Sequence, residues 1–283
     1  MSPGSTPASP PDGTTDQRTG PTRDGRRLAW YFGTLLVVYI GAIIVWWPTG
    51  DADPNPLMFL VVMYAPLVGA LLARFVGPGI IEWGRPSWWI FAGLIPSAAV
   101  LGVFLVVAGL GMGIEQTGLL RSALIGSAGL VIQACVLAFG EEVGWRGFLW
   151  PLLRMRFGFL LTALAVGIVW WIYHVPFIFL GWYGSMSGLP AFTVAIAGFT
   201  LFVGVITDRS RSVWPSVLAH GAWNALVATT FAVEIDGAMT PAFSGPDYIT
   251  GEFGWLPAVT MLTVGVLAAW WHLSTASDDG LAR

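Results

Sequence analysis

Eight apolar runs, separated by shorter polar segments, divide the chain. None of them alternates apolar and polar residues with the period of two that is typical of a half-buried strand. Most are about as long as a bilayer is thick, and in lipid a helix satisfies all its backbone hydrogen bonds within one segment. We therefore predict an all-α, polytopic membrane protein with about eight transmembrane helices. The runs cover residues 28–47, 57–73, 88–110, 122–142 with an apolar continuation to 153, 157–180, 190–207, 213–233 and 255–271.

The two ends of the chain are polar. Residues 1–25 are mostly Pro, Gly, Ser, Thr and Asp, which cannot bury enough apolar surface to offset the entropy of ordering. We expect a disordered tail there, a transmembrane domain over residues 26–275 and a short tail over 276–283. Arg26 and Arg27 also fit an export signal, but the run after them lacks an A-x-A cleavage site, which favours an uncleaved first helix.

Composition narrows the class of protein further. The 283 residues include 13 basic and 16 acidic side chains, 10% of the chain, whereas 55% are hydrophobic. Soluble domains carry about 25% charged residues, so an ordinary soluble enzyme is excluded. A net charge of −3 provides no basic surface for nucleic acid. The single cysteine, Cys135, excludes an internal disulfide, and in an apolar run it is expected to be inert packing.

Arginine is distributed unevenly between the two predicted sides of the membrane. The loops around Asp51, Glu115, Ser185 and Asp247 contain none, with Arg121 at a helix edge as the nearest exception. By the positive-inside rule, both termini are expected to be cytoplasmic. The basic residues are all arginine, a composition typical of a GC-rich genome, so we expect a bacterial plasma membrane. The arginines of the other side are Arg18, Arg23, Arg26, Arg27, Arg74, Arg85, Arg154, Arg156, Arg209, Arg211 and Arg283.

Five ionisable residues remain within or against the apolar runs: Glu141, Glu142, Arg146, His174 and His220. A charge at mid-bilayer costs about 2.5–3.5 kcal/mol on insertion scales, so such residues usually face a polar interior. Glu142 and Arg146, four residues apart, could simply neutralise each other and connect neighbouring helices. Glu141 points about 100° away and needs another partner, for which the two histidines are candidates.

This set of side chains suits the activation of water beside a carbonyl group. Glu141 could act as the general base, with His174 orienting the water. His220 and Asn224, one helical turn apart, could stabilise the oxyanion that forms. A zinc site made by a glutamate and two histidines is an alternative, although H-E-x-x-H is absent and an amide is a poor zinc ligand.

Three segments, in order and with matching spacing, resemble the motifs of the CPBP intramembrane proteases, the CAAX protease and bacteriocin-processing (Abi) family. Residues 141–147 resemble its E-E-x-x-x-R motif, His174 ends a segment like F-x-x-x-H, and residues 220–224 match H-x-x-x-N. The chain departs from the second motif, because Trp170 stands where the family has Phe. The resemblance covers roughly residues 120–230.

The resemblance implies an all-helical membrane fold with a cavity open to the cytoplasm. It implies that Glu141 and His174 activate water, that His220 and Asn224 stabilise the oxyanion, and that the supporting motif residues are Glu142 and Arg146. The implied substrates are peptides or proteins, membrane-embedded or lipidated ones among them. Whether a divalent metal such as zinc is required stays open.

Two functions from other classes remain alternatives to an endopeptidase. The buried carboxylates and histidines could form the relay of a proton-coupled or cation transporter, although no internal repeat is evident. A non-catalytic protein that confers immunity to a peptide toxin could also keep this fold. The sequence leaves open the substrate, the oligomeric state, the activity of this copy and the role of the loop over residues 234–254.

Overall fold

The computed structural model describes residues 23–46, 56–74, 84–111, 114–115, 119–228, 233–235, 238–240, 243–244 and 246–275. The predicted tails lie outside these residues, except that Arg23, Asp24 and Gly25 already belong to the first helix. The α-helices are α1 Arg23–Trp46, α2 Pro56–Arg74, α3 Pro86–Gly109, α4 Leu119–Gly144, α5 Trp150–Arg154, α6 Phe159–Phe179, α7 Leu189–Ser210, α8 Trp214–Trp223, α9 Asp247–Thr250 and α10 Trp255–Thr275.

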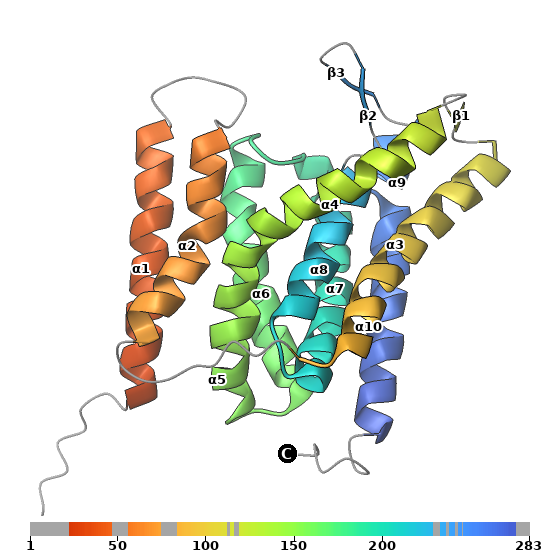
Figure 1. Ribbon diagram of the computed structural model, residues 1–283. Helices are drawn as coiled ribbons and strands as arrows, with labels where there is room; N and C mark the ends of the chain where they lie inside the picture. The colour runs from red at the N-terminus through yellow and green to blue at the C-terminus, as the bar shows by residue number, and fades with distance from the viewer. Residues whose placement is uncertain are drawn as a thin grey trace, which may run out of the picture.

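The eight apolar runs are helical in the parts that are described, apart from a few residues at their ends and Val233, which belongs to a strand; this confirms the all-α prediction (Figure 1). Among the described residues, five helical segments are long and apolar enough to cross a membrane, namely α1, α3, α6, η3 with α7 (η3, Met186–Gly188, is a 3-10 turn) and α9 with α10. Helix α2 is apolar over Leu57–Ala73 but shorter. The chain is therefore an integral membrane protein.

The remaining elements are short. Two π-helical turns continue α-helices: η2, Trp145–Leu149, joins α4 to α5, and η4, Asn224–Ala228, extends α8. Four strands of two or three residues form two antiparallel pairs, β1 with β4 and β2 with β3, in segments that were expected to be loops. The strands are β1 Ile114–Glu115, β2 Val233–Ile235, β3 Ala238–Thr240 and β4 Phe243–Ser244.

The helices form one bundle, in which α1 and α2 lie on one side, α4, α6, α7 and α8 in the middle, and α3 and α10 on the other side (Figure 1). Helices α7 and α10 approach closely through glycines, since a Cβ on Gly265 would lie 2.1 Å from the carbonyl oxygen of Gly198. Small residues of this kind permit close packing of helices in lipid, where no hydrophobic effect drives them together.

Charged side chains join the helix ends where α1 begins and α10 ends, the lower end in Figure 1. Asp208 accepts hydrogen bonds from Trp150 Nε1 at 2.8 Å and Arg154 Nε at 3.0 Å, which connects α5 to α7. His272, near the end of α10, is 1% exposed. Its Nδ1 accepts a hydrogen bond from Arg209 Nε at 2.9 Å, and its Nε2 lies 3.4 Å from Asp208 Oδ2.

Candidate active site

The two glutamates of the first motif lie near the end of α4, which continues without a break through η2 into α5. Their exposed fractions are 1% for Glu141 and 0% for Glu142. Gly140 and Gly144 flank them on the side of α2, where a Cβ on Gly144 would lie 2.3 Å from the Cβ of Pro66. These glycines allow α2 to pack directly against the motif. The π-helical turn that follows is a feature found frequently at functional sites.

One oxygen of Glu142 is bound by two basic partners, whereas its Oε2 is buried without a hydrogen-bond partner among the described residues. Its Oε1 accepts hydrogen bonds from Arg146 Nη1 and from His220 Nδ1, both at 2.9 Å. An ionised carboxylate only accepts hydrogen bonds, so Nδ1 of His220 carries a proton and Nε2 is the nitrogen left for a ligand. The Arg146 guanidinium also lies 4.5 Å from the centre of the Trp170 ring. Glu142 therefore joins α4 to α8 and fixes the orientation of His220.

Glu141 has different partners from those that the sequence suggested. Instead of a histidine, two indoles bind its Oε2: Trp170 Nε1 at 2.7 Å and Trp145 Nε1 at 3.3 Å. Both donors contact the same oxygen, and Glu141 lines a cavity. The other carboxylate oxygen, Oε1, is thus the one available to a water or substrate in that cavity.

His174 is held by the backbone of its own helix. Its Nδ1 lies 2.8 Å from the carbonyl oxygen of Trp170, and a carbonyl can only accept, so Nδ1 is protonated. In the neutral ring Nε2 is then an acceptor. The rings of Tyr183 and Phe192 lie 5.5 and 5.4 Å from the imidazole and restrict its rotation.

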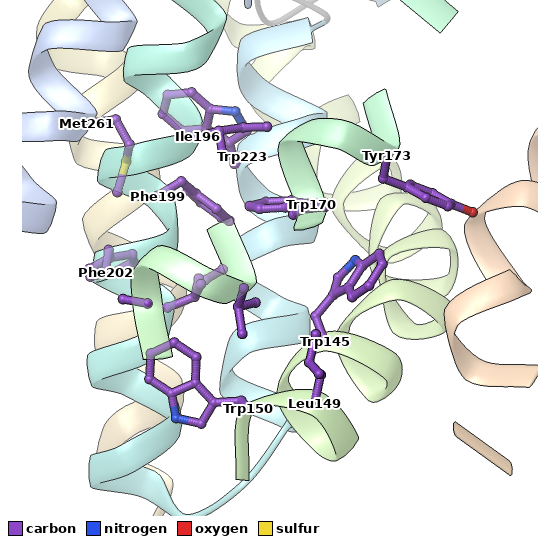
Figure 2. Close-up of a cluster of buried hydrophobic side chains, with 14 of the residues drawn as sticks. Trp145, Leu149, Trp150, Trp170, Tyr173, Ile196, Phe199, Phe202, Trp223 and Met261 are labelled. Carbon is purple, nitrogen blue, oxygen red and sulfur yellow. The ribbon is translucent and has the colours of Figure 1, made fainter. Parts of the chain in front are cut away.

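Trp170 connects the three motifs, a role that the sequence interpretation missed. Besides binding Glu141 and covering Arg146, its ring contacts both histidines, with centroid distances of 5.8 Å to His174 and 5.3 Å to His220. Figure 2 shows it between the Phe199 and Trp145 sides of the aromatic core. The sequence did indicate that Trp170 could contact the site, because it lies four residues before His174 and therefore on the same helical face.

The two histidines lie at different distances from the starts of their helices. His174 lies 15 residues after the start of α6 and His220 six residues after the start of α8, which correspond to about 22 Å and 9 Å of rise. Both imidazoles nevertheless contact the Trp170 ring. Asn224, four residues after His220, is the first residue of η4, and both side chains line the same cavity as Glu141.

The cavity has a volume of about 290 Å³ and a mostly apolar wall of aromatic and aliphatic side chains. Two of its polar residues, Tyr183 and Glu252, belong to none of the three motifs. Glu252 falls in the loop whose role the sequence left open. Among the tryptophans near the motifs, Trp170 and Trp223 contribute to the wall, whereas Trp145 and Trp150 are packed in the core.

The cavity lies in the half of the bundle that is distant from the described loop arginines. Its lining comes from the first turns of α2, the second half of α4, the last turns of α6, the start of α7 and the junction of α8 with η4. Except in α4, these are the ends that meet the arginine-free loops, the upper end in Figure 1. The expectation of cytoplasmic termini and that of a cavity open to the cytoplasm therefore conflict with each other in this structure.

The side chains of the site also bear on the zinc alternative. Within the described residues, no three His, Cys, Asp or Glu side chains are gathered in a way that could hold a metal ion. Glu141 gives one oxygen to two indoles, and His220 gives its Nδ1 to Glu142. The arrangement does not fit a zinc centre, and we derive no step through a metal.

The segment that carries the three motifs is similar to one known protein family. Residues 123–226 match the family model "Type II CAAX prenyl endopeptidase Rce1-like", and Glu141, His174, His220 and Asn224 all fall inside the match. The predicted family resemblance is confirmed. The match covers the chain from α4 to η4, so it supports a membrane-embedded peptidase at the level of the family. No curated protein is a significant match to this chain.

Proposed function

We propose that this protein is an intramembrane endopeptidase that hydrolyses peptide bonds with a water activated by Glu141 and His174. The observation that supports this function is that the two adjacent carboxylates, Glu141 and Glu142, have different hydrogen-bond partners. Glu142 is bound by Arg146 and His220, whereas Glu141 is held at one oxygen by two neutral donors and keeps the other for the cavity. Glu141 lines the cavity and Glu142 is not part of its lining, so Glu141 is the carboxylate that can reach a water there.

The reaction follows from the hydrogen bonds. Oε1 of Glu141 takes a proton from a water that also donates to Nε2 of His174, and the water oxygen attacks the carbonyl carbon of the peptide bond. The proton then passes from Glu141 to the leaving nitrogen as the C–N bond breaks.

The remaining residues stabilise the charge that develops on the carbonyl oxygen. Asn224 donates from its amide, and His220 donates from Nε2 while its Nδ1 is held by Glu142. Arg146 holds the Glu142 carboxylate in place. The two histidines thus have opposite roles: His174 accepts a hydrogen bond, whereas His220 donates one.

The test is cleavage of an internally quenched peptide by purified protein in detergent, with a peptide chosen from a library against the wild type. We expect Glu141→Gln and His174→Ala each to lower kcat by about 10²- to 10⁴-fold, the usual contribution of a positioned acid or base. Cys135→Ala serves as the control on α4 and should retain activity. Unchanged turnover in both site variants would refute the mechanism, and pH-gradient-driven flux without cleavage would favour a transporter.

We also propose that the arginine-rich end of the bundle is cytoplasmic, in a bacterial plasma membrane. This orientation turns the cavity toward the opposite side, so the substrate reaches it from outside the cytoplasm or from the bilayer. The argument rests on the described arginines Arg85, Arg154, Arg156 and Arg211 at one end. Single cysteines at Arg156 and at Ser187, in a Cys135→Ala background, test it with a membrane-impermeant maleimide. Labelling of the Arg156 site alone in intact cells would reverse the orientation.

A further inference from the structure

One carboxylate in the cavity is not used by the proposed mechanism. Glu252 precedes α10 and lines the cavity with Glu141 and His174, although some 80 residues separate it from His174 in the chain. The lining contains these two carboxylates and, among the described residues, neither arginine nor lysine. The nearby cation, Arg146, is bound to Glu142.

The position of Glu252 is fixed by its neighbour, Phe253. The Phe253 ring stacks on Phe192, with 4.8 Å between centroids and 13° between planes. A Cβ on Gly184 would lie 2.0 Å from the Phe253 ring, and one on Gly188 would lie 2.5 Å from its Cβ. Gly184 also has a φ of +62°, in the left-handed region that glycine adopts without strain. The loop after α6 is therefore shaped to receive Phe253, and this contact holds Glu252 at the cavity wall.

The surroundings of Glu252 prepare it to bind a charge. The Tyr183 hydroxyl lies within hydrogen-bonding reach of its carboxylate. Burial, and then the negative charge of Glu252, raise the pKa of Tyr183 well above its usual value, so the phenol remains a donor. The other ionisable groups that act on Glu252 are His174, His220 and Glu141. The lining also contains no arginine or lysine among the described residues, so a cationic group of the ligand would be the charge partner of the Glu252 carboxylate.

We propose that Glu252 is a specificity-determining residue that binds a cationic group, a guanidinium or an ammonium, on an otherwise apolar peptide substrate. The inference rests on the proposed peptidase function. Tyr183 orients the carboxylate, and the aromatic wall contacts the apolar part of the peptide. A substrate whose C-terminal carboxylate enters this part of the cavity is disfavoured, so the cleaved bond lies within a chain or next to a basic residue.

The test compares quenched peptides that carry arginine or citrulline, its neutral isostere, at each position around the cleaved bond. For the wild type we expect kcat/KM to be about 10- to 100-fold higher for arginine at one of these positions, the range of a charge-assisted hydrogen bond. Glu252→Gln should abolish this preference, and Glu252→Arg should transfer it to a glutamate peptide. Tyr183→Phe should reduce it. Asp24→Asn removes the same charge at the opposite end of the bundle and should leave the preference unchanged.

The outcomes separate the two proposals. Cleavage by the wild type without any preference for arginine over citrulline overturns the role of Glu252, whether or not the variants fold. A preference that persists in folded Glu252→Gln protein, with its thermal midpoint in detergent as the check on folding, also overturns it. Peptide binding to the Glu141→Gln protein is measured in parallel by fluorescence anisotropy. Tighter binding of the arginine peptide, with no cleavage by the wild type, would support the cation subsite and refute the peptidase.

Discussion

The indole of Trp170 gives the sharpest test of how Glu141 is held. Trp170→Phe keeps an aromatic ring of the kind found in the resembling motif but removes the N–H that lies 2.7 Å from Oε2 of Glu141. A hydrogen bond to a charged group contributes about 1.5–3 kcal/mol. If that bond positions the base in the transition state, its loss lowers kcat by about 10- to 100-fold. Trp145→Phe, whose hydrogen bond to Glu141 is longer at 3.3 Å, should have a smaller effect.

The control for this experiment lies one residue away on the same helix. Trp171 Nε1 donates to Thr193 Oγ1 at 2.9 Å, so Trp171→Phe also removes one indole hydrogen bond but leaves Glu141 untouched. Cleavage of a quenched peptide and thermal unfolding in detergent are measured for all three variants. We expect Trp171→Phe to cleave at the wild-type rate. Equal rates for folded Trp170→Phe and Trp171→Phe would refute the view that the indole positions the base.

Three further predictions concern the packing and charges around the site. Gly144→Ala places a Cβ against Pro66 and should lower the free energy of unfolding in detergent by about 1–3 kcal/mol, whereas Gly129→Ala, with open space around it, should not. Glu142→Gln leaves a buried arginine without its charge partner and should cost about 3–5 kcal/mol in the same denaturant assay; a loss below about 1 kcal/mol would contradict this ion pair. Asp208→Asn should lower the thermal midpoint by weakening the contact of α5 with α7, while the folded fraction cleaves at the wild-type rate, since the cavity lies at the other end.

Much of the fold could be predicted because lipid imposes a strong constraint on sequence. A helix that crosses a bilayer needs about 20 apolar residues, and this requirement made eight apolar runs recognisable in the sequence. The boundaries were within a few residues, as for the first run, predicted from residue 28 and found from Arg23. The short strand pairs were missed because two or three residues carry no detectable alternation.

The sequence predicted which motif residues form the site, but it did not predict the hydrogen bonds between them. The sequence indicated that Glu141 needed a partner other than Arg146, and the structure agrees. Which partner it took depended on the rotation of α6 relative to α4, a tertiary property that no local pattern encodes. A histidine seemed the natural choice by chemistry, but an indole donor reaches Glu141 instead. Glu252 could not be found, because a glutamate in an acidic loop carries no signal until Phe253 is seen packed against Gly184 and Gly188.

The two π-helical turns change what a one-residue insertion or deletion means in this chain. The first motif runs into η2 at Trp145, and the third motif passes into η4 at Asn224. A π turn contains one residue more than an α turn, and one residue corresponds to a rotation of about 100°. Deleting Gly147 would restore an ordinary α-helix with its backbone hydrogen bonds intact, yet it would turn Trp150 away from Asp208. Chain length at these two turns therefore sets the angle between the helix faces before and after each turn, rather than the distance between them.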